Sequence, residues 1–590
     1  MTARSQENFR IDDCEVYPSR NLITGPKGAT RVEPKAMAVL VELASKAGET
    51  VSRRDLIDAV WPRGFVTDDV LTRCVTQLRK ALGENRRHPR FLETVPRKGY
   101  RLLPRIAPFE HAGNRIEDRA QHPVLLVLPF QNLSGRQDQE YLADGMTELL
   151  IARLAAFQGL RVLSRTTAMS FKDRRISMPA LVQEIGVAWI VEGSIMLASE
   201  RLLVVAQLID AHCDAHVWAD EYRCAFTDLL DLQNDISTRV ATGIRLRIAP
   251  LSKPERPPRH VAADAMRGYL KARQLVSRRT PRALGEALMQ LAKVVEREPN
   301  YAQAWASMAE IHMLLAHYGA EPPQRAVPES RACVNRALAL DPGLAAALGC
   351  QGALALFFDR DPEAAEASLR RALELQPSYS LALISMANVC AVRGEFTEAN
   401  EWVQQALLID PRDIGINMNA ADHLILAGRY EEAARQLVRT LELHESHLPS
   451  RLRLVLALAL GGNHVEAARQ LENLKSAAGV SAQYWEYAAL AAAAHGDLEE
   501  AKNCAAELDH LARGGYIAPW ARARVFVAAG EIDRALDFLE QAAADQSSSL
   551  VFLGVTPVFE GLRGDPRMLA FMQRLGLPAP GWRPGGKPSE

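Results

Sequence analysis

The chain of 590 residues has little cysteine and few long apolar runs. It holds eight cysteines, and no two of them form a Cys-x-x-Cys pair. Scattered thiols of this kind are typical of a reduced cytosolic protein and argue against a disulfide framework. The longest apolar runs, PVLLVLPF and LVLALALGG, are far shorter than the roughly 20 residues that span a bilayer. The first residues, MTARSQENFR, lack the apolar core of a signal peptide. We therefore expect a soluble cytoplasmic protein that does not sense the periplasm directly.

The sequence also lacks the common motifs of catalysis and cofactor binding. It has no Gly-x-Ser-x-Gly elbow and no His-Glu-x-x-His helix. Gly135 and Gly145 do not belong to a phosphate-cradling loop, because neither a Gly-x-x-x-x-Gly-Lys nor a Gly-x-Gly-x-x-Gly pattern includes them. We therefore expect no enzyme activity, no cofactor and no metal.

One cluster has the residue types of a zinc site: His212, Cys213, Asp214, His216 and Cys224. Zinc requires about four ligands that converge on one point. Alternation along a strand would send Cys213 away from His212 and His216. Ordinary turn and strand residues are therefore the favoured interpretation.

Positive charge is concentrated at the N-terminal end of the chain. Residues 1–110 contain 20 Lys plus Arg and 14 Asp plus Glu, a net charge of +6. The remaining residues contain 50 and 57, a net charge of −7. Only the N-terminal part therefore has an electrostatic reason to contact nucleic acid.

The segment 68–100 has the pattern of a helix followed by a β-hairpin. Leu71, Val75, Leu78 and Leu82 recur at spacings of three and four, which predicts one buried stripe on the helix. The opposite face offers two cations, a hydroxyl and an amide, the groups that contact phosphates and base edges in a major groove. These residues are Arg73, Thr76, Gln77 and Lys80, and the hairpin tip adds Arg97 and Lys98.

Residues 9–103 resemble the OmpR/PhoB-type winged helix-turn-helix domain of response regulators and of ToxR- and CadC-like activators. The resemblance depends on short strands before Val32, the helix EPKAMAVLVELASKAGETVSR, the segment DLIDAVWP, the helix ending in QLRKALG and the final TVPRKGYRL. It implies that this last helix is the recognition helix and that the hairpin is a wing in the minor groove. It also implies that the loop between the helices, with Arg63 and Phe65, can contact RNA polymerase. Nothing before Phe9 has the length of a receiver domain, so we expect no control by aspartyl phosphorylation.

A second pattern follows a polar linker at 106–121. Apolar runs at 124–130 and 160–163, and at 188–197 and 201–210, alternate with helical segments, as in an α/β domain of about 130 residues. The segments LPFQNLS, EYLADGMTELL, VEGSI and HVWADEY resemble the TolB amino-terminal-like domain. That resemblance implies no catalytic residues.

A repeat of 34 residues fills the C-terminal half. Glycine recurs at 394, 428, 462, 496 and 530, and alanine follows five residues later at 399, 433, 467, 501 and 535. Further alanines at 353, 387, 421, 489 and 523 keep the same period, and Pro377 and Pro411 end their repeats. The pattern closely resembles tetratricopeptide repeats, which pair helices through small residues and stack into a superhelix. We expect eight such units between Val261 and about Ser549, followed by a closing helical segment.

The predicted protein is therefore multidomain. Its expected parts are a winged helix at 1–105 (α+β), a linker at 106–121, an α/β domain at 122–250, a linker at 251–262, an all-α repeat superhelix at 263–578 and a tail at 579–590. Asn388, Asp422, Gln483 and Glu486 are candidates for binding a protein or peptide partner on the inner wall, although solvated helix positions would look the same. We expect a transcriptional regulator that binds double-stranded promoter DNA and can form a homodimer on it. The alternatives are a protein scaffold whose winged helix does not bind DNA and a relative of nucleotide cyclases.

Overall fold

The computed structural model divides the chain into two compact units, residues 1–117 and 118–590. It describes residues 9–577 except for 12–13, 18–21, 26–27, 62–67, 83, 85–89, 96–97, 104–105, 109–122, 158, 173, 175, 199, 246–260, 318–319 and 479. No helix among these residues is both long and apolar enough to cross a membrane.

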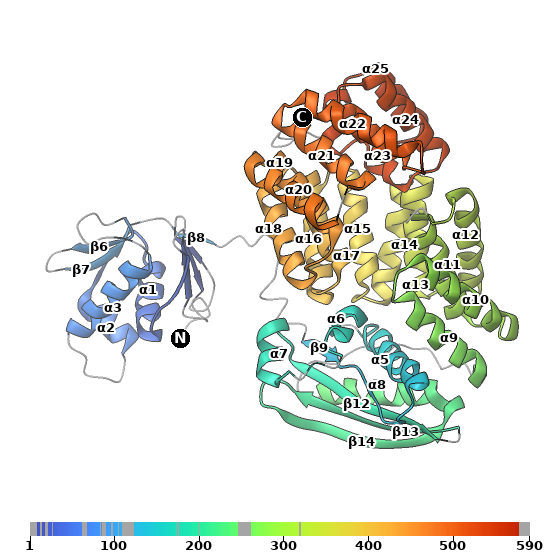
Figure 1. The fold of residues 1–590 in the computed structure, drawn as a ribbon. Helices are drawn as coiled ribbons and strands as arrows, with labels where there is room; N and C mark the ends of the chain where they lie inside the picture. The colour runs from blue at the N-terminus through green and yellow to red at the C-terminus, as the bar shows by residue number, and fades with distance from the viewer. Residues whose placement is uncertain are drawn as a thin grey trace. The chain divides into compact units, whose positions relative to one another are not determined.

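In the described part of the first unit, three helices accompany two antiparallel sheets (Figure 1). The first sheet has the order β4-β3-β2-β1-β8 and the second the order β5-β7-β6. Their strands are β1 (Phe9–Ile11), β2 (Cys14–Tyr17), β3 (Leu22–Gly25), β4 (Gly28–Arg31), β5 (Thr50–Ser52), β6 (Leu92–Val95), β7 (Gly99–Leu102) and β8 (Ile106–Pro108). The helices are α1 (Pro34–Ser45), α2 (Arg53–Val60) and α3 (Asp68–Ala81). The predicted winged helix fold is confirmed.

Local sequence explains where the helices begin. Pro34 occupies the first turn of α1, where its missing N–H costs nothing. The Ser52 hydroxyl accepts a hydrogen bond from the Asp55 N–H and so caps α2. Strand β8 was not predicted: its residues were expected to begin the linker, but Ile106 pairs with Ile11 and extends the first sheet.

The second unit begins with an α/β domain whose sheet has the order β11-β9-β12-β13-β14, with β10 beside β12. The strands are β9 (Val124–Val127), β10 (Gln131–Asn132), β11 (Arg161–Val162), β12 (Trp189–Ala198), β13 (Arg201–Asp210) and β14 (Ala215–Ala225). The helices are α5 (Glu140–Leu154), α6 (Arg165–Met169), α7 (Met178–Ile185) and α8 (Leu229–Arg245). The predicted α/β class is confirmed, and α6 is the helix that sequence reasoning missed.

Among the residues that the structure describes, eight antiparallel helix pairs follow, as the 34-residue period predicts. Their bounds are α9 (Ala263–Val276), α10 (Pro281–Arg297), α11 (Ala302–His317), α12 (Pro323–Leu340), α13 (Ala345–Leu354), α14 (Pro362–Leu375), α15 (Ser380–Val392), α16 (Phe396–Ile409), α17 (Ile414–Leu426), α18 (Tyr430–Leu443), α19 (Leu448–Leu460), α20 (His464–Ala478), α21 (Ala482–His495), α22 (Leu498–Ala512), α23 (Pro519–Ala528) and α24 (Ile532–Ala544). The short helices η6 (Ser548–Phe552) and η7 (Pro557–Leu562) and the helix α25 (Pro566–Arg574) end the array.

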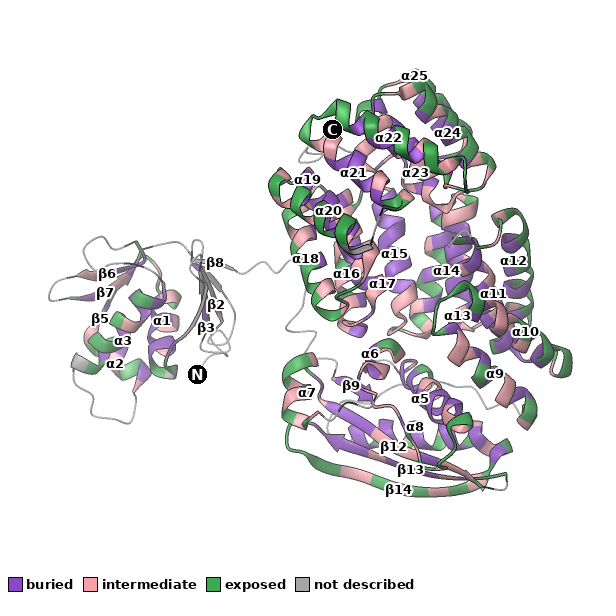
Figure 2. Cartoon of the chain, viewed as in Figure 1, coloured by how far each residue is buried: buried purple, intermediate pink, exposed green. Residues whose placement is uncertain are grey.

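The repeat signature has a direct structural reason. All five period glycines have positive φ, between 72° and 83°, because each forms the turn between the two helices of its unit. The alanines five residues later are at most 2% exposed, since they lie where the paired helices cross. Figure 2 shows the consequence: α15, a first helix, is almost entirely buried, whereas α12, a second helix, exposes one side.

The α/β domain and the first repeats share one hydrophobic core. Helix α9 packs against α5, and at Gly145 an added Cβ would lie 2.7 Å from the Leu270 side chain. Arg273 of α9 bridges the Glu148 carboxylate at 2.7 Å and the Glu310 carboxylate at 2.8 Å. Most of the predicted linker at 251–262 lies outside the described residues, yet this shared core means that the domain and the array form one unit.

The segment after the eighth pair folds back onto repeats far earlier in the chain. Val551 is buried in a cluster with Leu356 and Met386. The Phe552 and Phe357 rings are 6.3 Å apart, and Gln324 donates a hydrogen bond of 3.0 Å to the Ala544 carbonyl. The closing segment therefore connects the end of the array to its second, third and fourth units.

Candidate DNA interface in the winged helix domain

Helix α3 has one buried face and one exposed polar face, as its spacing predicts. Leu71, Val75, Leu78 and Leu82 are at most 5% exposed. On the opposite face, Arg73, Thr76 and Lys80 are exposed and Gln77 is half-buried. The helix thus presents two cations and a hydroxyl on a rigid support, which is the arrangement that direct readout of a major groove requires.

Two of these polar groups already have partners within the unit. The Thr76 hydroxyl donates to the Thr72 carbonyl at 2.8 Å, and the Gln77 amide oxygen accepts from the Glu33 N–H at 3.4 Å. A threonine hydroxyl that donates to its own helix can still accept, and the Gln77 amide nitrogen can still donate. Both residues therefore keep part of their hydrogen-bonding capacity for a base edge.

The wing is the hairpin of β6 and β7. Gly99 pairs with both Val95 and Ser52, and an added Cβ there would lie 1.9 Å from the Val51 carbonyl. Only glycine allows strand β7 to approach β5 so closely. Lys98 at the tip is exposed, whereas Arg97 lies outside the described residues.

Arg79 braces the wing against the recognition helix. Its guanidinium donates to the Leu92 carbonyl at 2.7 Å and to the Thr94 hydroxyl at 2.9 Å, both on β6. It also lies 3.6 Å from the Glu84 carboxylate. That carboxylate accepts hydrogen bonds from the N–H groups of residues 90, 91 and 92. One ion pair therefore sets the start of the wing relative to the end of α3.

Tyr100 provides a second link between the wing and the helices. Its ring is 2% exposed and lies beneath the Arg53 guanidinium, 5.3 Å from the centroid. Its hydroxyl lies 3.5 Å from the Thr72 hydroxyl at the start of α3.

Sequence reasoning missed these positioning residues, although one signal was present. Arg79 stands four residues after Val75 and eight after Leu71, so it falls on the buried stripe of the helix. A charged residue on an apolar stripe indicates a buried partner. The candidate polymerase contacts Arg63 and Phe65 lie outside the described residues and stay predictions.

The four partner-binding candidates in the array have different environments. Asn388 and Glu486 are buried, Asp422 is half-buried and Gln483 is exposed. Two of them are in ion pairs along successive first helices: Asp422 with Arg453 at 2.8 Å and Glu486 with Arg524 at 2.6 Å. Of the four side chains, only that of Gln483 is exposed. A partner-binding role for any of the four stays a prediction.

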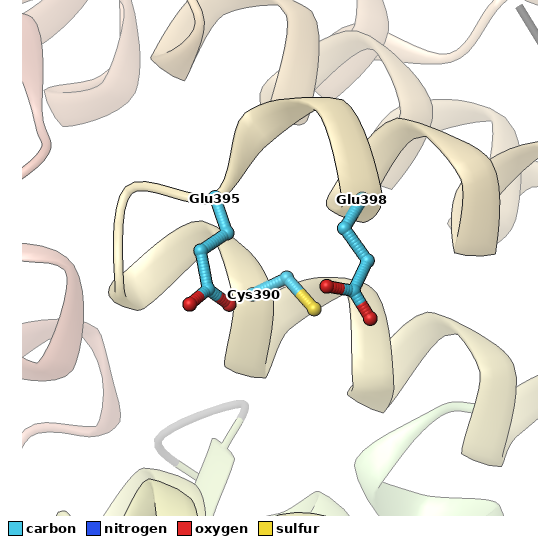
Figure 3. A group of neighbouring side chains, drawn as sticks. All are labelled: Cys390, Glu395 and Glu398. Carbon is cyan, nitrogen blue, oxygen red and sulfur yellow. The ribbon is translucent and has the colours of Figure 1, made fainter. Parts of the chain in front are cut away.

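One group of potential metal ligands occurs among the described residues, and it is not the cluster around His212. Donor atoms of Cys390, Glu395 and Glu398 lie within 4.8 Å of one another. Figure 3 shows the Cys390 sulfur directed toward the Glu398 carboxylate. Burial, and then the charge of Glu398, raises the pKa of the Cys390 thiol to about 12. A protonated thiol between two exposed carboxylates is a poor ligand set, and we assign no metal to it.

Two parts of the chain, the braced helix and wing and the α/β domain that follows, are similar to families of transcriptional regulators. Residues 27–102 match the family described as "Transcriptional regulatory protein, C terminal". Residues 120–239 match "HilA/YgeH-like transcriptional regulator, second domain". The likeness of the central domain to the TolB amino-terminal-like domain stays a resemblance.

Individual relatives are similar over different parts of the chain. The transcriptional regulator HilA of Salmonella typhimurium is 24% identical over 451 residues, which are 74% of this chain and 71% of HilA. A putative adenylate cyclase 3 of Rhizobium meliloti is 30% identical over 190 residues, only 32% of each protein. The solved DNA-binding domain of E. coli CadC is 35% identical and covers 18% of this chain and 99% of that domain, with a TM-score of 0.17.

Proposed function

We propose that this protein is a cytoplasmic, sequence-specific regulator that binds promoter DNA through α3 and the wing. The observation that carries the proposal is the exposed face of Arg73, Thr76 and Lys80 on a helix whose other face is fully buried. The cytoplasmic location is part of the proposal because a regulator must be able to reach promoter DNA. In this proposal Arg73 and Gln77 read bases, Lys80, Arg97 and Lys98 contact phosphates, and Arg63 and Phe65 contact RNA polymerase.

The deciding experiment is selection of genomic fragments bound by the purified full-length chain, followed by salt titration on the enriched fragment. Specific binding must persist in excess competitor DNA, and the affinity must fall linearly with the logarithm of salt concentration. A chain that enriches no sequence would instead support the scaffold function, in which the winged helix contacts protein.

The repeat array is proposed to receive a protein or peptide partner and so to control the winged helix. Tetratricopeptide arrays are extended recognition surfaces, and here the array is the largest element of the chain. A partner can change activity only through its difference in affinity between two states of the protein. The shared core of the second unit restricts such a change to the connection between the two units.

Catalysis is the weaker alternative. The similarity to the adenylate cyclase covers about a third of that protein, so its named activity does not extend to this chain. We propose that the chain acts by binding alone. An assay of the purified protein with ATP and Mg²⁺ would overturn this by detecting cyclic AMP.

A further inference from the structure

Strand β14 lies at one end of the sheet of the α/β domain. Among the residues that the structure describes, β14 pairs with β13 alone. It has 11 residues, enough to form a long ladder of backbone hydrogen bonds, and it contains no proline. Every residue of β14 is at least partly exposed, as the colours along its ribbon in Figure 2 show. Long open edges of this kind readily pair with another strand.

The direction of the backbone groups on β14 follows from its pairing with β13. The Phe226 N–H donates to the Glu200 carbonyl at 3.1 Å, next to the aligned pair of Arg201 and Ala225. Every second pair of an antiparallel ladder exchanges hydrogen bonds. Tyr222 and Cys224 therefore bond to β13, whereas Glu221 and Arg223 direct their N–H and C=O groups outward.

Glu221 and Arg223 also carry exposed opposite charges on the same face of the sheet. Their side chains are 49% and 76% exposed, and Arg223 Nε donates to Glu221 Oε1 at 2.7 Å. The other face of the strand is engaged within the domain, since Asp220 pairs with Arg239 of α8 and the Arg239 guanidinium lies over the Tyr222 ring.

We propose that β14 pairs antiparallel with β14 of a second copy of this chain, with the two-fold axis at Tyr222. Outward-directed residues must face outward-directed residues, so each allowed register places one residue opposite its own copy. An axis at Asp220, Glu221 or Arg223 would oppose two like charges, which destabilises a sheet. An axis at Tyr222 instead places Glu221 of each copy opposite Arg223 of the other. A second copy of the chain is therefore the partner that fits this edge, because the charges of β14 are complementary to those of the same strand in reverse.

The pairing joins the two α/β sheets into one continuous sheet and makes the protein a dimer without any contribution from DNA. This inference goes beyond DNA binding and does not depend on it. Its consequence for a regulator is that one dimer carries two winged helices, which raises the effective concentration of the second once the first is bound.

Disulfide trapping in the full-length chain tests the register. The background carries Cys213→Ala and Cys224→Ala, because these two thiols are exposed or half-buried in the same domain. Tyr222→Cys would place two thiols across the axis in a pair whose Cα atoms are about 4.5 Å apart. Ala219→Cys is the matched control, since in this register Ala219 faces Ala225 of the other copy. We expect a covalent dimer with Tyr222→Cys and none with Ala219→Cys. Equal trapping of both, or trapping of Ala219→Cys alone, would overturn the proposal.

Charge reversal tests the same surface without removing the Tyr222 ring. Glu221→Lys and Arg223→Glu should each weaken the dimer about tenfold or more in sedimentation equilibrium without DNA, because two symmetric pairs become repulsive. The double variant should restore the dimer to within about threefold. Arg136→Glu, an exposed change elsewhere in the domain, is the control and should have no effect. A chain that stays monomeric, or single reversals that leave the dimer intact, would contradict the proposal.

Discussion

Thr167 donates a hydrogen bond of 2.7 Å to the Asp410 carboxylate and so joins two residues 243 positions apart in the chain. Beside it, the Ser164 N–H donates to the Ile409 carbonyl at 3.0 Å, and Arg412 pairs with Glu184. These contacts attach α6 and α7 to the loop between α16 and α17. The α/β domain is therefore held to the array here as well as at α9.

The Asp410 contact predicts a pH dependence of stability. Burial, and then the nearby charge of Asp413, raises the pKa of Asp410 to about 7, although Ser164, Thr167 and Arg279 act in the opposite direction. An unfolded aspartate titrates near pH ~4. Between about pH 4 and about pH 7 the folded state binds more protons, so the free energy of unfolding should fall as pH rises and level off above that range.

Asp410→Asn tests this dependence by calorimetry of the full-length chain. The variant should flatten the pH dependence between about pH 4 and pH 7, over which the contribution of Asp410 changes by at most about 4 kcal/mol. Asp361→Asn, an exposed helix cap in the array, is the control. An unchanged slope in Asp410→Asn would show that other groups set the dependence.

Lys80 is expected to contact phosphate. Lys80→Ala should weaken binding to all DNA sequences alike and lower the salt slope by about one unit, because one fewer counterion is released. Lys46→Ala removes an exposed cation at the end of α1, where Lys46 pairs with Glu42 at 2.8 Å, and should leave the slope unchanged. Fluorescence anisotropy at several salt concentrations measures both, and equal slopes in the two variants would remove Lys80 from the interface.

Arg73 is expected to read a base. Arg73→Ala should relax the preference at one position of the operator by about 1–3 kcal/mol. It should leave the free energy of unfolding nearly unchanged, because the residue is exposed. Selection from a randomised library checks the preference, and a uniform loss of affinity across sequences would reassign Arg73 to phosphate.

Arg79 should act on stability and DNA affinity together. Arg79→Ala removes the bonds to Leu92 and Thr94 and leaves the Glu84 carboxylate, 2% exposed, without its cation. We expect the first unit to lose about 3 kcal/mol of stability and the folded fraction to bind DNA more weakly. Chemical denaturation of residues 1–117, a compact unit by itself, measures the first effect. If Arg79→Ala is as stable as Arg73→Ala, Arg79 does not hold the wing against α3.

Arg524 tests whether the charges of the array serve folding. Arg524→Ala leaves Glu486 buried without a partner and should cost about 3 kcal/mol. Replacing both residues by methionine should recover most of that loss. Arg282→Ala breaks an exposed pair with Glu286 and is the control, with less than about 0.5 kcal/mol expected. If the three variants unfold alike, the ion pair of Arg524 and Glu486 does not stabilise the fold. Glu486 would then again be a candidate for contact with a partner.

Much of this architecture could be predicted from sequence because its determinants are local and periodic. The stripe of Leu71, Val75 and Leu78 defines α3, and the spacing of Gly394 from Ala399 defines a repeat, since both depend on helix geometry alone. The contact of Thr167 with Asp410 could not be predicted, because no periodicity states which two loops will meet. The same holds for Arg79, because its place on the buried stripe indicates a buried partner without indicating that the partner lies on β6.

The contact of Val551 and Phe552 with the second to fourth units changes how the array should come apart. A linear solenoid frays from its ends, because each unit is held only by its neighbours. In this chain, opening the segment after the last pair would also uncover Leu356 and Met386 in the third and fourth units, so these two regions should open in a single event. Amide hydrogens of α13 and α24 should then exchange with the same opening free energy, so the last pair of the array should not unfold before the third unit.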